Sequence, residues 1–102
     1  MNGQKLAGLM GLAIRARQAA IGTDACRMMI RNGQCGVLLA DGSAGDNTRK
    51  KAEDLCRQSG TPLMILPPGS VEQATGKSCM LLGIRKGSFT EGILKIKEIS
   101  DL

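Results

Sequence analysis

Histidine, tryptophan and tyrosine are missing from this sequence of 102 residues, and Phe89 is its one aromatic residue. Without histidine, the chain lacks the side chain that most often serves as a general acid or base. With a single aromatic ring, it has little means of holding nucleic-acid bases by stacking. We therefore expect an aliphatic core, no enzymatic activity, no cofactor and no small-molecule substrate.

Closely spaced cysteines are missing as well. No two of the four form a Cys-x-x-Cys motif, so we expect no metal site. Each lies within or beside an apolar stretch, which is typical of small reduced core residues. Two disulfides remain possible from the count alone, but no other feature is typical of a secreted chain. The four are Cys26, Cys35, Cys56 and Cys79.

The chain has no long uninterrupted apolar segment. Arg15 and Arg17 interrupt the apolar N-terminal stretch, so the sequence predicts neither a signal peptide nor a membrane span, and we expect a cytoplasmic protein. The charge that is present is mainly positive, with 14 Lys and Arg against 9 Asp and Glu, for a net charge of +5. This balance favours a polyanionic partner, although a solvated basic surface explains it equally well.

Apolar spacing and turn residues divide the chain into alternating helices and strands. The predicted helices cover residues 3–17, 23–32, a stretch from 46–48 to 59, residues 70–75, and a last stretch that starts at Ser88 and includes Ile99. The predicted strands cover residues 18–21, 35–40, 61–66 and 79–84. Alternation of this kind favours an α/β fold, a three-layer α/β/α sandwich, and the length favours one domain over residues 1–102.

Side chains that can cap a helix stand at the predicted helix starts, where they would accept hydrogen bonds from free backbone N–H groups. Gly33 is a typical left-handed end for the helix at 23–32. Residues 41–45 predict a flexible loop between a strand and a helix. The candidate caps are Thr23 or Asp24; Asp46, Asn47 or Thr48; Ser70; and Ser88, which with Glu91 makes a capping box.

The start of the helix at residues 23–32 is the best candidate binding site. Its free backbone N–H groups and the positive end of its dipole can hold phosphate or base acceptors. Gly22 lets another backbone approach closely, and Arg27 and Arg31 add positive charge nearby. An ordinary helix start explains the same residues without any ligand.

A second basic group lies in the first turn of the next predicted helix, at residues 49–51. Cations at a helix start oppose the helix dipole, by roughly 0.3–1 kcal/mol each. This local conflict favours a role in partner binding and makes Lys50 a candidate contact, with a solvated basic face as the alternative.

Six short stretches, each weak alone, occur in order along the chain. They are LAIRARQAAIG at 12–22, RNG at 31–33, VLLAD at 37–41, NTRKK at 47–51, TP at 61–62 and ATGK at 74–77. In this order they resemble the kink-turn-binding ribosomal protein family, and within it the small bacterial YlxQ-like branch. The resemblance spans essentially the whole chain. It implies a three-layer sandwich around a four-stranded mixed sheet, and a non-enzymatic RNA-binding function.

In that family the start of the second helix reads tandem sheared G·A pairs through the pattern Gly-x-Asn-Glu-x-x-Lys. Here Gly22 matches the glycine, and Asp24, Ala25 and Met28 stand where the family has Asn, Glu and Lys. A second contact comes from the loop before the last strand, residues 77–80 in this sequence. The resulting candidate RNA-binding residues are Gly22, Thr23, Asp24, Arg27, Met28, Arg31, Lys50, Ser78 and Cys79.

We expect a monomer with no membrane partner. The resemblance implies a chain that is ribosome-associated or like a ribosomal protein, whose partner is structured RNA, with ribosomal RNA as a candidate. Because three of the four pattern positions differ, a protein-interaction module on the same fold is the alternative. A substrate-binding accessory domain, related to those on RNA methyltransferases, is a third possibility and would need a separate catalytic partner.

Overall fold

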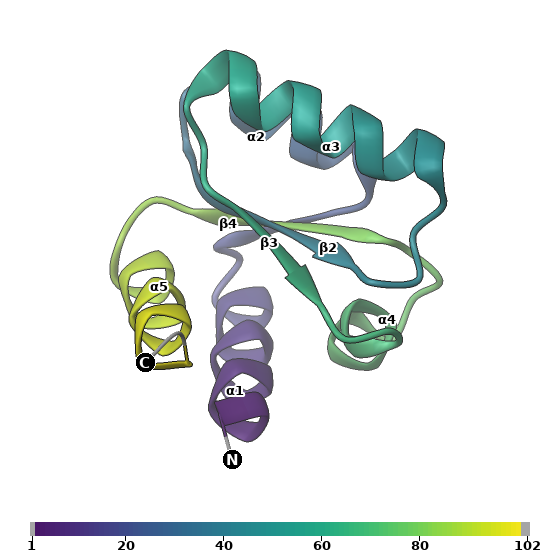
Figure 1. Cartoon of the computed structure of the whole chain (residues 1–102). Coiled ribbons are helices and arrows are strands. Elements are labelled where there is room, and N and C mark those ends of the chain that lie inside the picture. The colour runs from purple at the N-terminus through teal and green to yellow at the C-terminus, as the bar shows by residue number, and fades with distance from the viewer. Residues whose placement is uncertain (1, 101–102) are drawn as a thin grey trace.

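The computed structural model describes the backbone of residues 2–100 and the side chains of residues 4–96 (Figure 1). Helices and strands alternate along the chain, and the predicted ends differ from the observed ones by at most two residues. The helices are α1 (Asn2–Arg15), α2 (Thr23–Arg31), α3 (Asp46–Ser59), α4 (Ser70–Thr75) and α5 (Ser88–Ser100). The strands are β1 (Ala19–Ile21), β2 (Cys35–Asp41), β3 (Leu63–Leu66) and β4 (Leu81–Arg85).

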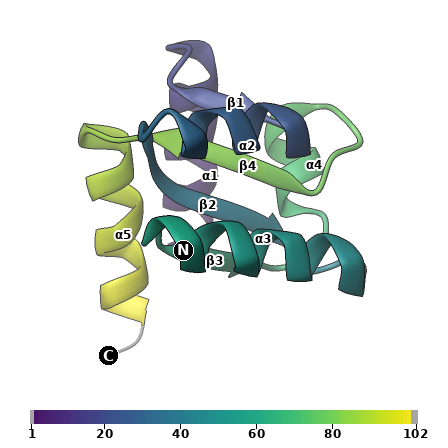
Figure 2. The same ribbon diagram turned by 90° about the horizontal axis from the view of Figure 1, so that it is seen from above.

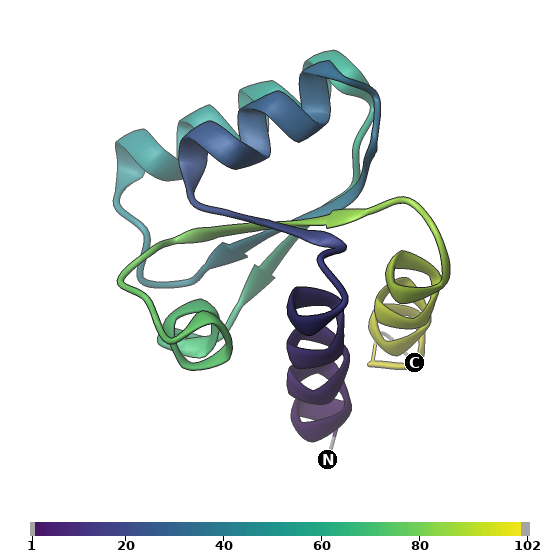
Figure 3. The ribbon, with the colours of Figure 1, turned by 180° about the vertical axis from the view of Figure 1, so that it is seen from behind.

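The strands form one sheet in the order β1-β4-β2-β3. Strands β2 and β3 are parallel, with Leu38 opposite Leu63, whereas β4 runs antiparallel to both of its neighbours. Helices α2 and α3 cover one face of the sheet, and α1, α4 and α5 cover the other (Figures 1 and 3). The predicted three-layer sandwich around a four-stranded mixed sheet is therefore confirmed for the described part of the chain.

Aliphatic side chains fill the space between the layers, as the scarcity of aromatics requires. Each fully buried Leu or Ile contributes about 1.5–3 kcal/mol through removal of its surface from water. All four cysteines are free in the structure; Cys26, Cys35 and Cys56 are buried in the core, and Cys79 is half-buried at its margin. The main buried side chains are Met10, Val37, Leu39, Leu82, Ile84 and Ile93 toward α1, α4 and α5, and Cys26, Leu38, Ala40, Ala52 and Leu81 toward α2 and α3.

The predicted side-chain caps are wrong for α2, α3 and α4. Each of these helices begins after a glycine that occupies the cap position, and no side chain makes a cap hydrogen bond there. Thr23, Asp46 and Ser70 instead form the first helical residue. The last helix follows the same rule, since the N–H of Glu91 donates to the carbonyl of Gly87 at 3.1 Å. A glycine precedes each of these helices, and the polar side chains fall inside the first turn.

Ile99, which the pattern assigns to the apolar face of α5, lies outside the side chains that the structure describes. None of the helices in the described residues is both long and apolar enough to cross a membrane.

Candidate functional site

Strands β1, β2 and β3 end at the same edge of the sheet, and α2, α3 and α4 begin there. Strand β4 runs the opposite way and begins at this edge, after the loop of residues 77–80. Figure 2 shows α2 and α3 side by side with their starts on the same side of the molecule. We name this end of the sheet the carboxyl edge. Ligands of open α/β sheets commonly bind outside the carboxyl ends of strands.

A backbone hydrogen bond of Gly22, the residue before α2, holds the start of this helix against β4. Gly22 has φ 94° and ψ 166°, a backbone conformation that is essentially restricted to glycine. Its N–H donates to the carbonyl of Leu81 at 3.0 Å, and its carbonyl accepts from the N–H of Cys26 at 3.0 Å. The backbone N–H groups of residues 23–25 precede this first helical bond, so they point outward from the helix start. Asp24 is almost fully solvent-exposed there, with 97% of its side chain accessible.

The loop of residues 77–80 lies beside this helix start because it leads directly into Leu81. The hydroxyl of Thr75 braces the loop: it accepts from the N–H of Lys77 at 3.1 Å and lies 3.5 Å from the sulfur of Cys79. The carbonyl of Met80 accepts from the N–H of Asp41 at 2.8 Å, which joins the loop to the end of β2. The carboxyl edge is thus one connected surface of three chain segments.

In the segment predicted to be a flexible loop, residues 41–45, Asp41 belongs to the end of β2 and residues 42–45 form the loop. The side chain of Asp41 is 1% exposed, and its carboxylate accepts from the N–H and hydroxyl of Ser43 at 2.9 and 2.6 Å. It also accepts from the N–H groups of Gly69 and Val71, each at 3.0 Å. Burial alone would raise its pKa, but these hydrogen bonds lower the pKa to about 2. The charged carboxylate therefore ties the loop after β2 to the start of α4.

Charges of both signs surround the carboxyl edge. Arg27 lies 3.7 Å from Asp24, a long and exposed ion pair of small energetic value. Arg49 donates to the carbonyl of Gly42 at 3.4 Å, so the side chain reaches back over the loop. Lys50, the next residue along α3, is exposed. The edge can therefore offer hydrogen-bond donors, acceptors and cations to a ligand.

Most of the predicted site residues meet at this edge. Those on the first two turns of α2 and those of the 77–80 loop lie on adjacent segments, and Lys50 lies on the neighbouring helix start. Arg31 does not belong to this group, because it ends α2, roughly 13 Å along the helix from Gly22. Sequence reasoning missed Asp41 and Arg49 as organisers of the edge. The acid that closes the apolar run of β2 was the available signal for Asp41.

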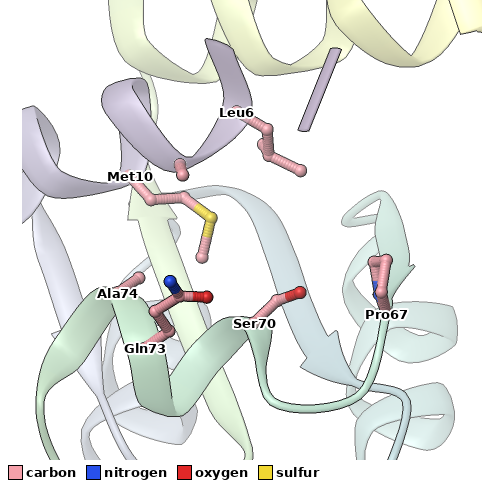
Figure 4. Close-up of a pocket in the computed structure, with 7 residues that line it drawn as sticks. Leu6, Met10, Pro67, Ser70, Gln73 and Ala74 are labelled. Atoms are coloured by element: carbon pink, nitrogen blue, oxygen red, sulfur yellow. The ribbon is translucent and has the colours of Figure 1, made fainter. Parts of the chain in front are cut away.

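A pocket of about 420 Å³ lies elsewhere, between α1 and α4 on the other face of the sheet (Figure 4). Met10 points into the space between the two helices, opposite Gln73 and Ala74. The lining side chains are apolar or uncharged, so the pocket holds no group for acid–base chemistry. Among the described residues, no three Cys, Asp or Glu side chains are arranged to hold a metal ion.

No protein-family model matches this chain, but comparison with known proteins finds relatives that span most of its length. RNA-binding protein YlxQ of Enterococcus faecium is 29% identical over 99 residues, which cover 96% of this chain and 93% of that protein. RNA-binding protein YlxQ of Bacillus subtilis (strain 168) is 37% identical over 62 residues, 61% of this chain and 62% of that protein. The chain is therefore similar to RNA-binding proteins named YlxQ over almost its whole length. The resemblance seen in the sequence is thereby confirmed.

Solved structures agree on the fold of this YlxQ-like chain. A protein of unknown function from Bacillus halodurans C is 27% identical and superposes with a TM-score of 0.84, covering 92% of this chain and 97% of that one. A 15.5kD RNA-binding protein from Giardia lamblia, 13% identical, has a TM-score of 0.74 and covers 98% of this chain and 88% of its own. At that identity the likeness concerns the fold alone.

Proposed function

We propose that this chain is a non-enzymatic RNA-binding protein that recognises structured, kink-turn-like RNA at its carboxyl edge. The observation that carries the proposal is the hydrogen bond from Gly22 N–H to Leu81 O, 3.0 Å long, which makes the α2 start and the 77–80 loop one surface. Two curated relatives named as RNA-binding proteins support the choice of RNA as the ligand.

The chemistry of this edge fits a folded RNA better than a plain phosphate chain. The outward N–H groups of residues 23–25 can donate to phosphate or base acceptors. The exposed carboxylate of Asp24 can accept from base amino groups, which a nonspecific phosphate binder does not need. Met28 is 65% exposed and adds an apolar surface next to these groups. Donors, an acceptor and an apolar side chain together favour contact with base edges.

Ribosomal RNA is the first candidate for the ligand, because the sequence resembles ribosomal proteins. We infer a monomer associated with the ribosome in the cytoplasm. Sedimentation of the tagged chain with ribosomal particles, and loss of this co-sedimentation after nuclease treatment, would support the assignment. A chain that remains at the top of the gradient in low salt would contradict it.

The test of RNA recognition is a gel shift with a kink-turn RNA and a scrambled hairpin of equal length across a salt series. We expect tighter binding to the kink-turn, with a preference that persists as salt rises. Equal, weak and steeply salt-dependent binding to both would indicate backbone electrostatics alone. Absence of binding to either RNA at low salt would overturn the proposal.

A pair of matched substitutions locates the binding surface. Arg27→Gln removes a cation beside the α2 start and should weaken kink-turn binding by roughly 5- to 10-fold, about 1 kcal/mol. Arg57→Gln removes a cation on α3 that pairs with Asp54 at 3.0 Å, and it should change binding much less. Equal effects of the two substitutions would count against a site at the α2 start.

The second candidate function is a protein-interaction module on the same fold. The exposed Met28 favours it, because the sulfur-containing apolar side chain stands in place of the family lysine. A partner captured by the tagged chain that stays bound after nuclease treatment would support this candidate. A partner released by nuclease would support RNA binding instead.

A further inference from the structure

Four cations gather at the end of the sheet opposite the carboxyl edge. Backbone hydrogen bonds bring their segments together: the N–H of Arg85 donates to the carbonyl of Gln18, and that of Lys86 to the carbonyl of Gln34, each at 2.8 Å. The turn after α1, the end of α2 and the end of β4 thereby become neighbours. The basic edge, as we name this surface, consists of Arg17, Arg31, Arg85 and Lys86.

The four side chains of the basic edge are exposed and uncompensated. Among the side chains of residues 4–96, the ion pairs join Arg27 to Asp24 and Arg57 to Asp54, so none involves the basic edge. Glu91, in the first turn of α5, is the acid nearest to the edge in sequence. The carboxyl edge, by contrast, mixes acids with bases. Positive charge without a paired acid is therefore also present far from the α2 start.

Stabilisation of helix ends explains only some of the cations of the basic edge. Helices α1, α2 and α3 end on this side of the molecule, and cations in a last turn stabilise a helix, as Arg31 does for α2 (Figure 2). Arg85 ends a strand and Lys86 lies in the turn after it, so their own elements do not call for charge. Arg17 has φ 59°, a left-handed conformation that glycine adopts with less strain. The fold does not require cations at these three positions.

A polar hollow of about 120 Å³ opens beside Lys86. The hydroxyl oxygens of Ser59 and Thr61, 2.7 Å apart, belong to its rim, and the backbone at Gly33 and Gly60 completes it. Lysine ammonium groups and hydroxyls are common ligands of nucleic-acid phosphates. Exposed cations beside a polar recess fit a surface that follows a phosphate backbone.

We propose that the basic edge is a second RNA contact, which holds the phosphate backbone of a helical segment flanking the RNA element at the carboxyl edge. This inference rests on the proposed RNA-binding function. The molecule measures 30 × 29 × 26 Å, so the flanking segment must reach across about one full width of the protein. A long stem on a sharply bent RNA satisfies this requirement, whereas a minimal kink-turn hairpin does not.

The test compares two double variants that each lower the net charge by two. Arg85→Gln with Lys86→Gln removes half of the basic edge, and Lys5→Gln with Lys95→Gln removes exposed cations from α1 and α5. Binding of each protein is measured by fluorescence anisotropy across a salt series. The probes are a kink-turn RNA with one long stem, the same RNA with that stem shortened, and a straight duplex.

With the long-stem RNA, the basic-edge variant should bind roughly 10- to 100-fold more weakly than wild type at low salt, and the slope of log affinity against log salt should fall by about two. With the short-stem RNA the two double variants should bind alike. If they also bind the long-stem RNA alike, the basic edge is not an RNA contact, while preference for the kink-turn over the duplex would still support the carboxyl-edge site. If wild type binds none of the probes, the proposed function itself fails.

The variant Arg17→Gly tests whether the Arg17 cation contributes to RNA binding without lowering the stability of the fold. Glycine relieves the left-handed strain at this position, so the thermal midpoint should not fall. Loss of the cation should still weaken long-stem binding and lower the salt slope by about one. An unchanged salt slope in this variant would contradict the assignment of Arg17 to the RNA contact.

Discussion

The carboxylate of Asp41 lies beneath the carboxyl edge and joins backbone groups from the loop after β2 and the start of α4. It touches none of the predicted RNA-binding residues, yet the N–H of the same residue donates to Met80 in the 77–80 loop. One buried acid therefore supports two of the segments that shape the candidate site.

Asp41→Asn should lower the free energy of unfolding by about 2–3 kcal/mol, because a charged acceptor of several hydrogen bonds is lost. The folded-state pKa of about 2 lies below the ordinary 3.8, so the carboxylate contributes stability above pH 4 that is lost as pH falls toward 2. Urea unfolding at pH 7, 4 and 2 measures both effects. Asp46→Asn, at an exposed aspartate, is the control and should change little. Identical curves for the two variants would contradict the role of Asp41.

The cysteines differ sharply in their expected reactivity. Burial raises the pKa of Cys26 to about 12 and that of Cys56 to about 11, and it also raises the pKa of Cys35. The thiolate is the reactive form, so these three should stay inert in the folded protein. Cys79 is half-buried in the loop at the carboxyl edge and should react first with a thiol reagent such as DTNB.

Modification of Cys79 therefore reports occupancy of the proposed site. We expect one fast-reacting thiol in the native protein at pH 8, and kink-turn RNA should slow its reaction several-fold while a scrambled hairpin does not. Cys79→Ser should abolish the fast phase. An unaltered fast phase in the presence of saturating kink-turn RNA would place the RNA elsewhere.

At the scale of the elements, a glycine precedes each of the helices that begin at the carboxyl edge. Two of these glycines, Gly22 and Gly45, have different backbone conformations. Gly22 has a positive φ of 94°, whereas Gly45, which begins α3, has φ −68° and ψ 167°. A Cβ atom at either position would meet nothing within 4 Å. Backbone conformation alone therefore distinguishes them.

Gly22→Ala should destabilise the protein by roughly 1–3 kcal/mol, because alanine is strained in that conformation. Gly45→Ala should cost less than about 1 kcal/mol, since its backbone suits any residue. Chemical denaturation of both variants measures the difference. Equal stabilities would mean that the turn into α2 does not depend on glycine.

Helix α2 also carries the positions at which this chain differs from the family pattern. Asp24, Ala25 and Met28 are all exposed, so the fold should tolerate their replacement. The triple variant Asp24→Asn, Ala25→Glu, Met28→Lys restores the family residues and should tighten kink-turn binding by about tenfold or more. Isothermal titration against wild type measures the gain. Weaker binding by the triple variant would show that this chain reads RNA by other contacts.

At the scale of the whole molecule, the sequence predicts the layers well because apolar spacing records burial directly. The run of β2 and the helical spacing of Cys26 and Ile30 each place the correct side chains in the core. The helix starts are predicted less well, since capping by Thr23 competes with a turn that depends on a distant partner, Leu81. Long-range hydrogen bonds, like those from Gly69 and Val71 to Asp41, leave no local pattern in the sequence.

In the candidate site, too, local sequence patterns identify the segments, whereas long-range contacts decide how they are arranged. Sequence resemblance finds the α2 start and the 77–80 loop, and the pairing of β1 with β4 explains why they are neighbours. The charge pattern of the sequence also assigns Arg31 to that site, although the residue lies at the other end of α2. Apolar periodicity places Arg31 on the helix α2. The direction in which α2 runs across the sheet, which the sequence does not show, puts the Arg31 charge at the end of the molecule opposite the carboxyl edge.

The central claim is that structured RNA binds at the carboxyl edge, and backbone amide NMR tests it most directly. Isotope-labelled protein is titrated with a kink-turn RNA at physiological salt, and shift changes are mapped onto the chain. We expect the largest changes at residues 22–25 and 77–80, with smaller ones at the basic edge when the RNA carries a long stem. Shift changes that spare both of those segments would contradict the claim.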